Sequence, residues 1–250
     1  MEQVVLVTRH GNDALYRVST EFTSKLPWRR IPMVGTSADG YLKAILRLPV
    51  KWVVNLDDDA FLTRAESLTS LMQHMEQNGY DYCGVADGSN GTIRYYFNAA
   101  SMNPFFNIFW VESIRRKLNV NAEIGIGWKD EFKTMVPAFT PEKWQTEPVR
   151  WPCAQEPYYP FFFHLLRDCR PLFLKASTLH DNDDHITSIA SDHEGNVFLY
   201  HTWYSRIYGR GRHFLGEDPH NQTRIDYVIR LARSLVATPV LSYQRLPPVS

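Results

Sequence analysis

The segment Trp52–Leu56, with the sequence WVVNL, constrains the fold most strongly because almost every residue in it is apolar. A strand that is apolar on both faces must be covered on both faces, which is typical of a parallel sheet packed between helices. Similar strands alternate with helix-spaced segments along the first 90 residues. We expect strands at Val4–Thr8, Ile31–Thr36, Trp52–Leu56 and Tyr82–Ala86, with helices at Asp13–Leu26, at Asp39–Leu48 and after Thr63. This order predicts an α/β domain with a mainly parallel sheet.

The third of these helices has recognisable ends. Thr63 and Glu66 have the spacing of a capping box, and Gly79 is placed to end the helix in a left-handed conformation. The core-facing stripe between them comprises Leu68, Leu71, Met72 and Met75.

The second half of the chain is less regular. We expect strand and loop over Phe97–Phe109, a long loop at Lys133–Trp151, a helix at Tyr158–Leu166, a strand at Leu172–Ala176 and an amphipathic helix at Gln222–Ala237. Since there is no repeat and no low-complexity tract, the sequence predicts a single domain over residues 1–250.

Composition excludes several classes of protein. The 27 Lys and Arg balance the 27 Asp and Glu, whereas a dedicated nucleic-acid binder normally has a basic excess. The 7 Trp, 13 Tyr and 14 Phe provide flat faces suited to sugar rings or nucleobases. Three scattered cysteines indicate a reducing compartment.

The sequence also predicts where the protein acts. The first residues, MEQVVLV, carry neither the basic region nor the cleavage site of a secretory signal. Apolar stretches such as Pro104–Val111 are far shorter than the roughly 20 residues of a membrane span. We therefore expect a cytoplasmic protein without a transmembrane segment, with peripheral attachment to a membrane as an open alternative.

Three carboxylates, Asp57, Asp58 and Asp59, directly follow the apolar strand. Alternation along an extended chain places Asp57 and Asp59 on one side, about 6–7 Å apart. Adjacent carboxylates repel one another, and a hard divalent cation such as Mg²⁺ or Mn²⁺ would hold them together. Open α/β sheets bind ligands at the carboxyl ends of their strands. The alternative is an acidic loop that caps the next helix.

At this point the chain resembles the GT-A class of nucleotide-sugar glycosyltransferases over most of residues 1–206. The resemblance rests on the DxD motif of Asp57–Asp59 and on the preceding segment, SADGYLKAILRLPVKWVVNL, which begins at Ser37. It implies a Rossmann-like α/β/α sandwich, with residues 1–100 forming the nucleotide-sugar-binding part and residues 101–250 the acceptor side. It also implies a divalent ion, Mn²⁺ or Mg²⁺, held by the DxD against the donor diphosphate. A UDP-sugar is the favoured donor.

The resemblance assigns further residues to the site. Nucleotide-sugar binding falls on Thr8, Arg9, Asp39, Lys43, Asp57, Asp58 and Arg206. A histidine from the C-terminal part often completes the metal site in this class, and His201, after the short apolar strand Val197–Tyr200, is the candidate beside Asp57 and Asp59. Neutral imidazole is a suitable ligand for Mn²⁺. The alternative is a packed histidine without a metal.

Glu156 is the candidate general base. It precedes an aromatic segment expected to be helical, with Pro157 suited to the first helical position. The surrounding segment resembles the x-E-D segment of inverting GT-A enzymes, but Pro157 stands where the final Asp would be. A simple helix cap is the alternative, and Asp130 and Glu131 are rival bases.

Two other segments have both a functional and a structural interpretation. Arg206, Arg210 and Arg212 lie in a glycine-containing stretch that could close over a diphosphate or remain a solvated loop. The run HDNDDH at His180–His185 could chelate a metal, but Asn- and Asp-rich stretches are more typical of solvated turns.

The sequence therefore predicts a metal-dependent glycosyltransferase that transfers a sugar to a carbohydrate or glycoconjugate acceptor hydroxyl, with inversion. Two alternatives remain open. A nucleotidyltransferase acting on sugar phosphates would use the same carboxylates at an α-phosphate, but the turn after the first strand, TRHGN, is poor in glycine. A non-catalytic carbohydrate-binding protein would keep the aromatic residues but would not need three clustered carboxylates.

Overall fold

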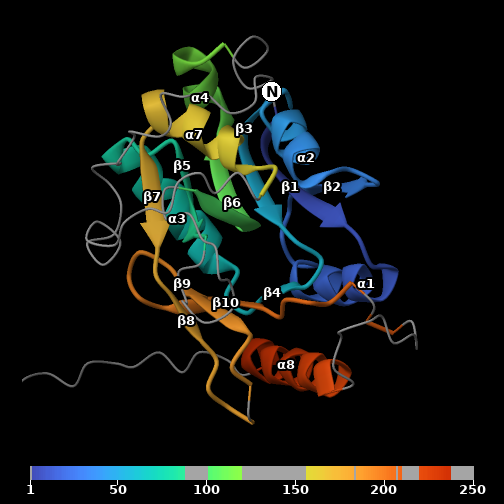
Figure 1. Ribbon diagram of the computed structural model, residues 1–250. Helices are drawn as coiled ribbons and strands as arrows, with labels where there is room; N and C mark the ends of the chain where they lie inside the picture. Colours follow the sequence, from blue (N-terminus) through green and yellow to red (C-terminus); the bar gives the residue numbers. More distant parts are fainter. Residues whose placement is uncertain are drawn as a thin grey trace, which may run out of the picture.

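A six-stranded mixed sheet forms the centre of the computed structural model, which describes residues 2–87, 101–119, 156–182, 184–206, 208–209 and 220–237 (Figure 1). Its order is β2 (Arg29–Val34), β1 (Glu2–His10), β3 (Val50–Leu56), β6 (Met102–Trp110), β5 (Tyr82–Ala86) and β7 (Pro171–Leu174). The β1–β2, β1–β3 and β5–β7 pairs are parallel, and β6 runs antiparallel to both of its neighbours. The predicted α/β class with a mainly parallel sheet is confirmed.

Strand β6 is longer than the sequence predicts. Pro104, which indicates a loop in the sequence, lies inside this strand. Proline lacks the N–H that a sheet ladder requires, so a strand tolerates it only where the regular ladder of backbone hydrogen bonds is interrupted. The ladder is interrupted at this point, because the β5–β6 register shifts between Gly84 and Ala86 and the pairing of β6 with β3 stops at Phe106. Residues 97–100 of the expected segment lie outside the described residues.

Helices cover both faces of this sheet. Along β1, Val5 and Val7 belong to one apolar cluster and Leu6 to the other, as the alternation of a strand requires. The Leu6 side is covered by α1 (Asp13–Phe22), α3 (Glu66–Asn78) and α8 (His220–Ala237). The opposite side is covered by α2 (Ala38–Ile45), α4 (Val111–Lys117) and α7 (Tyr159–Asp168). The described residues therefore form the three layers expected of an α/β/α sandwich.

A second, four-stranded antiparallel sheet was not predicted. It has the order β4 (Ala60–Leu62), β10 (Val197–His201), β9 (Ser188–Ser191) and β8 (Ala176–Thr178). Its strands are three to five residues long, too short for a clear alternating pattern. Strand β4 begins directly after the Asp triplet, so this small sheet extends from the carboxyl end of β3.

Several helix ends differ from the sequence predictions. The capping box is wrong: α3 begins at Glu66 after Ala65, with no side-chain cap. The reason is that the Thr63 N–H is bonded to the Phe198 carbonyl, which extends the β4–β10 pairing past the strand end. Helix α1 ends at Phe22, earlier than expected. The predicted end of α3 is confirmed, because Gly79 has a φ of +70°.

Gly84 lets β5 and β6 approach closely. A methyl group added to it would overlap the Asn107 side chain and lie 2.9 Å from the Phe106 carbonyl oxygen. We expect Gly84→Ala to lower the free energy of unfolding by about 1–3 kcal/mol, the usual cost of overpacking, measured by urea denaturation. Gly11→Ala is the control, because its added methyl would lie 3.7 Å from the nearest atom, an Asp58 oxygen. Equal stability of the two variants would contradict this packing.

Candidate metal centre

The acidic triplet forms the turn that joins the two sheets. Strand β3 ends at Leu56, and the Asp57 N–H donates to the Phe105 carbonyl of β6. The Asp57 carbonyl then accepts from the Ala60 N–H at 3.2 Å, which closes the turn before β4. All three aspartates are buried, with 6–8% of each residue exposed. Burial of three neighbouring carboxylates requires specific compensation for each one.

Asp57, Asp59 and His201 form a compact group of metal-ligand type. One ligand atom from each residue lies within 4.8 Å of the others, and all three residues are buried. The His201 Nε2 atom is 3.2 Å from Asp59 Oδ1. The Asp57 Oδ1 atom is buried without a hydrogen-bond partner, as is His201 Nδ1. Two carboxylates and an imidazole, with a carboxylate oxygen left unpartnered, fit a divalent ion such as Mn²⁺ or Mg²⁺.

The pairing of β4 with β10 brings His201 to the carboxylates. His201 stands opposite Ala60 in this antiparallel pair, and the following Thr202 N–H donates to the Asp59 carbonyl at 3.1 Å. The imidazole stacks on Phe105, with ring centroids 4.3 Å apart. The ring is therefore fixed by a strand register and by aromatic packing, although it lies more than 140 residues along the chain from Asp59.

Different partners hold the two proposed carboxylate ligands. Arg9 Nη2 lies 3.0 Å from Asp57 Oδ2, and this carboxylate raises the pKa of Arg9 further. Burial raises the pKa of Asp57 above its usual value, against the opposing effect of Arg9. Burial also acts to raise the pKa of Asp59, but His201 and the 2.6 Å hydrogen bond from the Ser205 hydroxyl outweigh it and lower the pKa to about 2.

Asp58 has a separate structural role. Its Oδ2 accepts from the backbone N–H groups of Gly11 and Asn12, each at 2.7 Å. Burial and the two adjacent carboxylates nevertheless raise the pKa of Asp58 to about 7. Asp58 thus fixes the turn between β1 and α1. The sequence analysis assigned Asp58 to nucleotide-sugar binding and did not predict this structural role.

Asn12 is a site residue that the sequence analysis missed. Its Oδ1 caps α1 by accepting from the N–H groups of Ala14 and Leu15. Its Nδ2 lies 2.9–3.4 Å from three carbonyl oxygens of the segment after β10, those of Ser205, Arg206 and Tyr208. An asparagine just before a helical pattern is a recognisable cap signal. Its contacts with Ser205, Arg206 and Tyr208 leave no signal in the neighbouring sequence.

A cleft of about 950 Å³ lies over the metal-ligand group. The predicted site residues that line it are Arg9, Asp57, Asp58, Asp59, Glu156, His201 and Arg206. Tyr204, 51% exposed, and the partly buried Trp203 add aromatic surface, and both have positive φ angles, 50° and 58°. The structure therefore brings together, in one cavity, candidate residues from four separate parts of the sequence.

Three predicted nucleotide-binding residues do not line this cleft. Thr8 is buried in β1 opposite Pro32 of β2. Asp39 and Lys43 form an ion pair of 3.1 Å with each other along α2, the usual spacing of a stabilising helix pair. The start of the same helix does reach the cleft, through residues 35–38. Thr8, Asp39 and Lys43 therefore lie outside the lining of the cleft.

Glu156 lies at the cleft wall, partly buried. Its carbonyl accepts from the Tyr159 N–H, and α7 begins at Tyr159 with Pro160 in its first turn. The prediction that Pro157 occupies the first helical position is therefore wrong, because the helix begins two residues later. Two of the three candidate bases, Asp130 and Glu131, lie outside the described residues, as do Arg210 and Arg212.

The HDNDDH run resembles a turn more than a metal site. Asp184 is buried and accepts from the Ile186 and Thr187 N–H groups at 2.8 Å each, an Asx-type arrangement, while His180 and His185 are exposed. Within the described ranges, the Asp57–Asp59–His201 group is the only set of three or more such side chains close enough to share an ion. Asp183 lies outside the described residues.

Comparison of the chain with protein-family models and with curated proteins gives no match. Among the helices that the structure describes, none is both long enough and apolar enough to span a bilayer. The chemistry of the site must therefore be argued from its own geometry.

Neighbouring aspartates offer a matched test of the metal centre. We expect Asp57→Asn to weaken Mn²⁺ binding at least about tenfold, because a neutral amide replaces an unpartnered carboxylate oxygen, whereas Asp58→Asn should change it far less. Isothermal titration with Mn²⁺ measures both variants. Equal losses in the two variants, or no loss in Asp57→Asn, would contradict the assignment.

Metal affinity should also depend on pH. Burial raises the pKa of Asp57, so protons compete with the ion for this ligand at higher pH than they would at an exposed aspartate. We expect the apparent Mn²⁺ affinity to increase with pH through the titration range of Asp57, with proton release on binding. Calorimetry in buffers of different ionisation enthalpy measures the released protons. Affinity that stays constant across this range would argue against a buried carboxylate ligand.

Proposed function

We propose that the protein is a metal-dependent glycosyltransferase that moves a sugar from a nucleotide-diphosphate donor, with a UDP-sugar favoured, to an acceptor hydroxyl. The observation that carries the proposal is the meeting of Asp57, Asp59 and His201 with Glu156 in one cleft of about 950 Å³. A cavity of this size is within the usual range for small-molecule sites. Its place at the carboxyl end of β3 is where α/β sheets bind ligands.

Asp57, Asp59 and His201 would hold the divalent ion. When bound, such an ion supplies Lewis-acid stabilisation to the negative charge that a departing diphosphate develops. Arg9 fixes Asp57 through an ion pair of 3.0 Å and lines the same cleft. The exposed Arg206 is one of the residues whose carbonyl groups Asn12 holds, and its guanidinium can donate to phosphate oxygens. Arg9 and Arg206 both line the cleft in which an anionic donor would bind, which supports the proposal.

Glu156 is suited to accept a proton from the acceptor hydroxyl. That hydroxyl has a pKa far above neutrality, so its attack needs a carboxylate within hydrogen-bond reach. Glu156 stands just ahead of α7, where the positive end of the helix dipole favours the ionised form. Deprotonation by a carboxylate opposite the leaving group leads to inversion at the anomeric carbon. Tyr204 and Trp203 provide the aromatic surface for a carbohydrate or glycoconjugate acceptor.

The direct test is an assay of UDP-sugars with and without Mn²⁺. The proposal predicts slow hydrolysis to UDP and free sugar, dependent on Mn²⁺ and lost in Asp59→Ala. A nucleotidyltransferase would instead release or consume pyrophosphate with a sugar phosphate. A non-catalytic binding protein would bind sugars without turnover. Either of these results would overturn the proposal.

The role of Glu156 has its own test. We expect Glu156→Gln to lower transfer by about 10²–10⁴-fold, the usual contribution of a general base, while donor affinity stays near wild type. Glu194→Gln, at an exposed position in the β9–β10 turn, is the control and should retain full activity. Proton NMR of the product reports the anomeric configuration. Retained configuration, or a nearly active Glu156→Gln, would transfer the role to another group.

A further inference from the structure

The segment that follows His201 has a strained backbone. Trp203 and Tyr204 have φ angles of +58° and +50°, in the left-handed region that bulky side chains rarely adopt. Among the other described non-glycine residues, Asn182 shares this conformation, and asparagine tolerates it far better than an aromatic residue does. Such strain persists only where the surrounding structure imposes it, and it clusters at ligand-binding sites.

Helix α8 and Asn12 hold this segment by its carbonyl groups. Arg224 Nη2 donates to the Trp203 carbonyl at 3.0 Å, and Asn221 Nδ2 donates to the Tyr204 carbonyl at 2.6 Å. The carbonyl oxygens of the next two residues lie 3.3–3.4 Å from Asn12 Nδ2. Four consecutive carbonyl groups therefore accept hydrogen bonds from side chains that lie outside the segment.

Arg224 is itself held in one orientation. Its side chain is 10% exposed, and its Nη1 donates to the Thr187 hydroxyl at 2.8 Å. Its Nε donates to Asn221 Oδ1 at 3.1 Å, and a carboxylate oxygen of the buried Asp184 lies 3.8 Å from Nη1. Arg224 and Asn221 thus form a bonded pair near the start of α8, and neither of them is among the described residues that line the cleft.

The two strained residues present their side chains differently. The Trp203 ring packs against His201, with centroids 4.5 Å apart, and its indole N–H donates to the Ser188 hydroxyl at 2.8 Å. Tyr204 lines the cleft and is 51% exposed. Because the segment is anchored through its carbonyl groups, the Tyr204 ring is fixed at its backbone and still accessible to a ligand.

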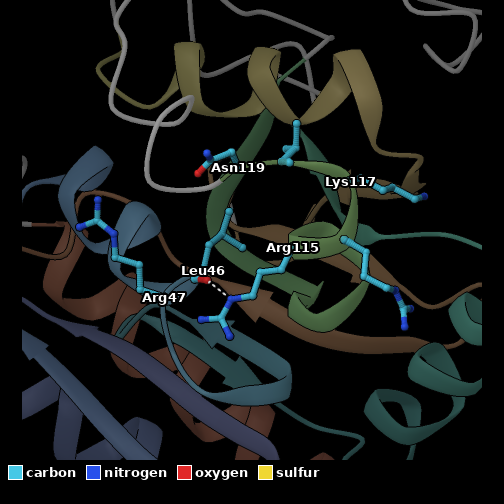
Figure 2. A pocket seen from close by; sticks show the side chains of 7 residues that line it. Leu46, Arg47, Arg115, Lys117 and Asn119 are labelled. Atoms are coloured by element: carbon cyan, nitrogen blue, oxygen red, sulfur yellow. Dashed lines mark hydrogen bonds between the residues drawn. The ribbon is translucent and has the colours of Figure 1, made fainter.

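Arginine has a different role in another hollow, of about 640 Å³, at the ends of α2 and α4 (Figure 2). There Arg115 Nε donates to the Leu46 carbonyl at 2.8 Å, and the side chains of Arg47 and Arg115 point away from each other. The side chains labelled in Figure 2 do not converge on one point. The cleft over the metal-ligand group is therefore the better place to expect a ligand.

We propose that Arg224 and Asn221 are positioning residues, which hold Tyr204 in its strained conformation so that its ring can stack on a sugar ring in the cleft. This inference rests on the proposed function, which supplies a sugar as the ligand. An aromatic ring that is fixed before binding loses less conformational entropy when the ligand arrives. The donor and the acceptor both carry a sugar ring, so this chemistry is common to the two.

The positioning role is tested first without a ligand, by fluorine NMR of the whole protein labelled with 3-fluorotyrosine. The Tyr204 signal is assigned by its absence from Tyr204→Phe. We expect Arg224→Gln and Asn221→Ala each to move this signal toward the position of free 3-fluorotyrosine, because the ring gains freedom. Arg230→Gln, at an exposed position of the same helix, is the control and should leave the signal unchanged. If Arg224→Gln fails to fold, Asn221→Ala carries the test, and an unchanged signal in the folded variants would overturn the positioning role.

Two variants that both remove the Tyr204 ring isolate the backbone strain. We expect Tyr204→Gly to melt about 2–4 °C above Tyr204→Ala, because glycine adopts a positive φ without strain. At an exposed position with an ordinary φ, the alanine variant would be the more stable of the two. Equal melting temperatures, or a more stable Tyr204→Ala, would contradict the strained conformation on which the proposal depends.

The ligand is then tested with probes that separate donor from acceptor, with Mg²⁺ as a diamagnetic ion. UDP and UDP-glucose represent the donor, and the methyl glycosides of glucose, galactose and mannose represent the acceptor. A Tyr204 signal that shifts with UDP-glucose but not with UDP assigns the ring to the donor sugar, and a shift with a methyl glycoside assigns it to the acceptor. In either case Arg224→Gln should weaken binding of that probe at least about threefold, the order expected when one side chain loses its preorganisation.

Two outcomes would overturn the sugar assignment: a shift with UDP alone, which would give the ring to the nucleobase, and no shift with any probe. These results are distinguishable from failure of the proposed function. The positioning role is measured in the ligand-free protein, whereas the proposed function fails if UDP-sugars are not hydrolysed in a metal-dependent way.

Discussion

Mutual repulsion among Asp57, Asp58 and Asp59 is the constraint on which the rest of the site depends. Three consecutive buried carboxylates are costly unless each one is compensated. The fold meets this requirement with a guanidinium for the first, two backbone N–H groups for the second, and an imidazole with a hydroxyl for the third. These partners come from β1, from the turn before α1 and from the region around β10. The triplet therefore fixes the relative positions of distant parts of the chain.

The same arrangement explains why the small second sheet matters. Strand β4 starts one residue after the triplet, and its pairing with β10 determines which residue faces Asp59. A shift of this pairing by one residue would turn the His201 side chain to the other face of the sheet. Asn12 adds a second connection, because it caps α1 and also donates to the carbonyl groups of Ser205, Arg206 and Tyr208. The site is thus built on strand register and on a helix cap rather than on one loop.

The sequence predicts local features of this fold well and distant ones poorly. The apolar strand that ends in three aspartates is a local pattern, and so is the glycine that ends α3. The antiparallel direction of β6 and the short strands of the second sheet depend on long-range pairing that leaves no periodic signal.

Individual residue assignments failed for a similar reason. Thr63 and Glu66 match a local capping pattern, but the Thr63 N–H bonds to the Phe198 carbonyl instead. His201 was a candidate because of a family resemblance, and its approach to Asp59 required the β4–β10 register. Asp39 and Lys43 were assigned by the same resemblance, yet they pair with each other.

The central claim is that Asp57, Asp59 and His201 coordinate one divalent ion, and electron spin-echo spectroscopy of the protein with added Mn²⁺ tests it most directly. The described geometry places an imidazole nitrogen 3.2 Å from a carboxylate oxygen of the same group. The account predicts modulation from a directly bonded imidazole nitrogen, and loss of that modulation in His201→Gln. A spectrum of the fully hydrated ion, or a nitrogen modulation that persists without His201, would contradict it.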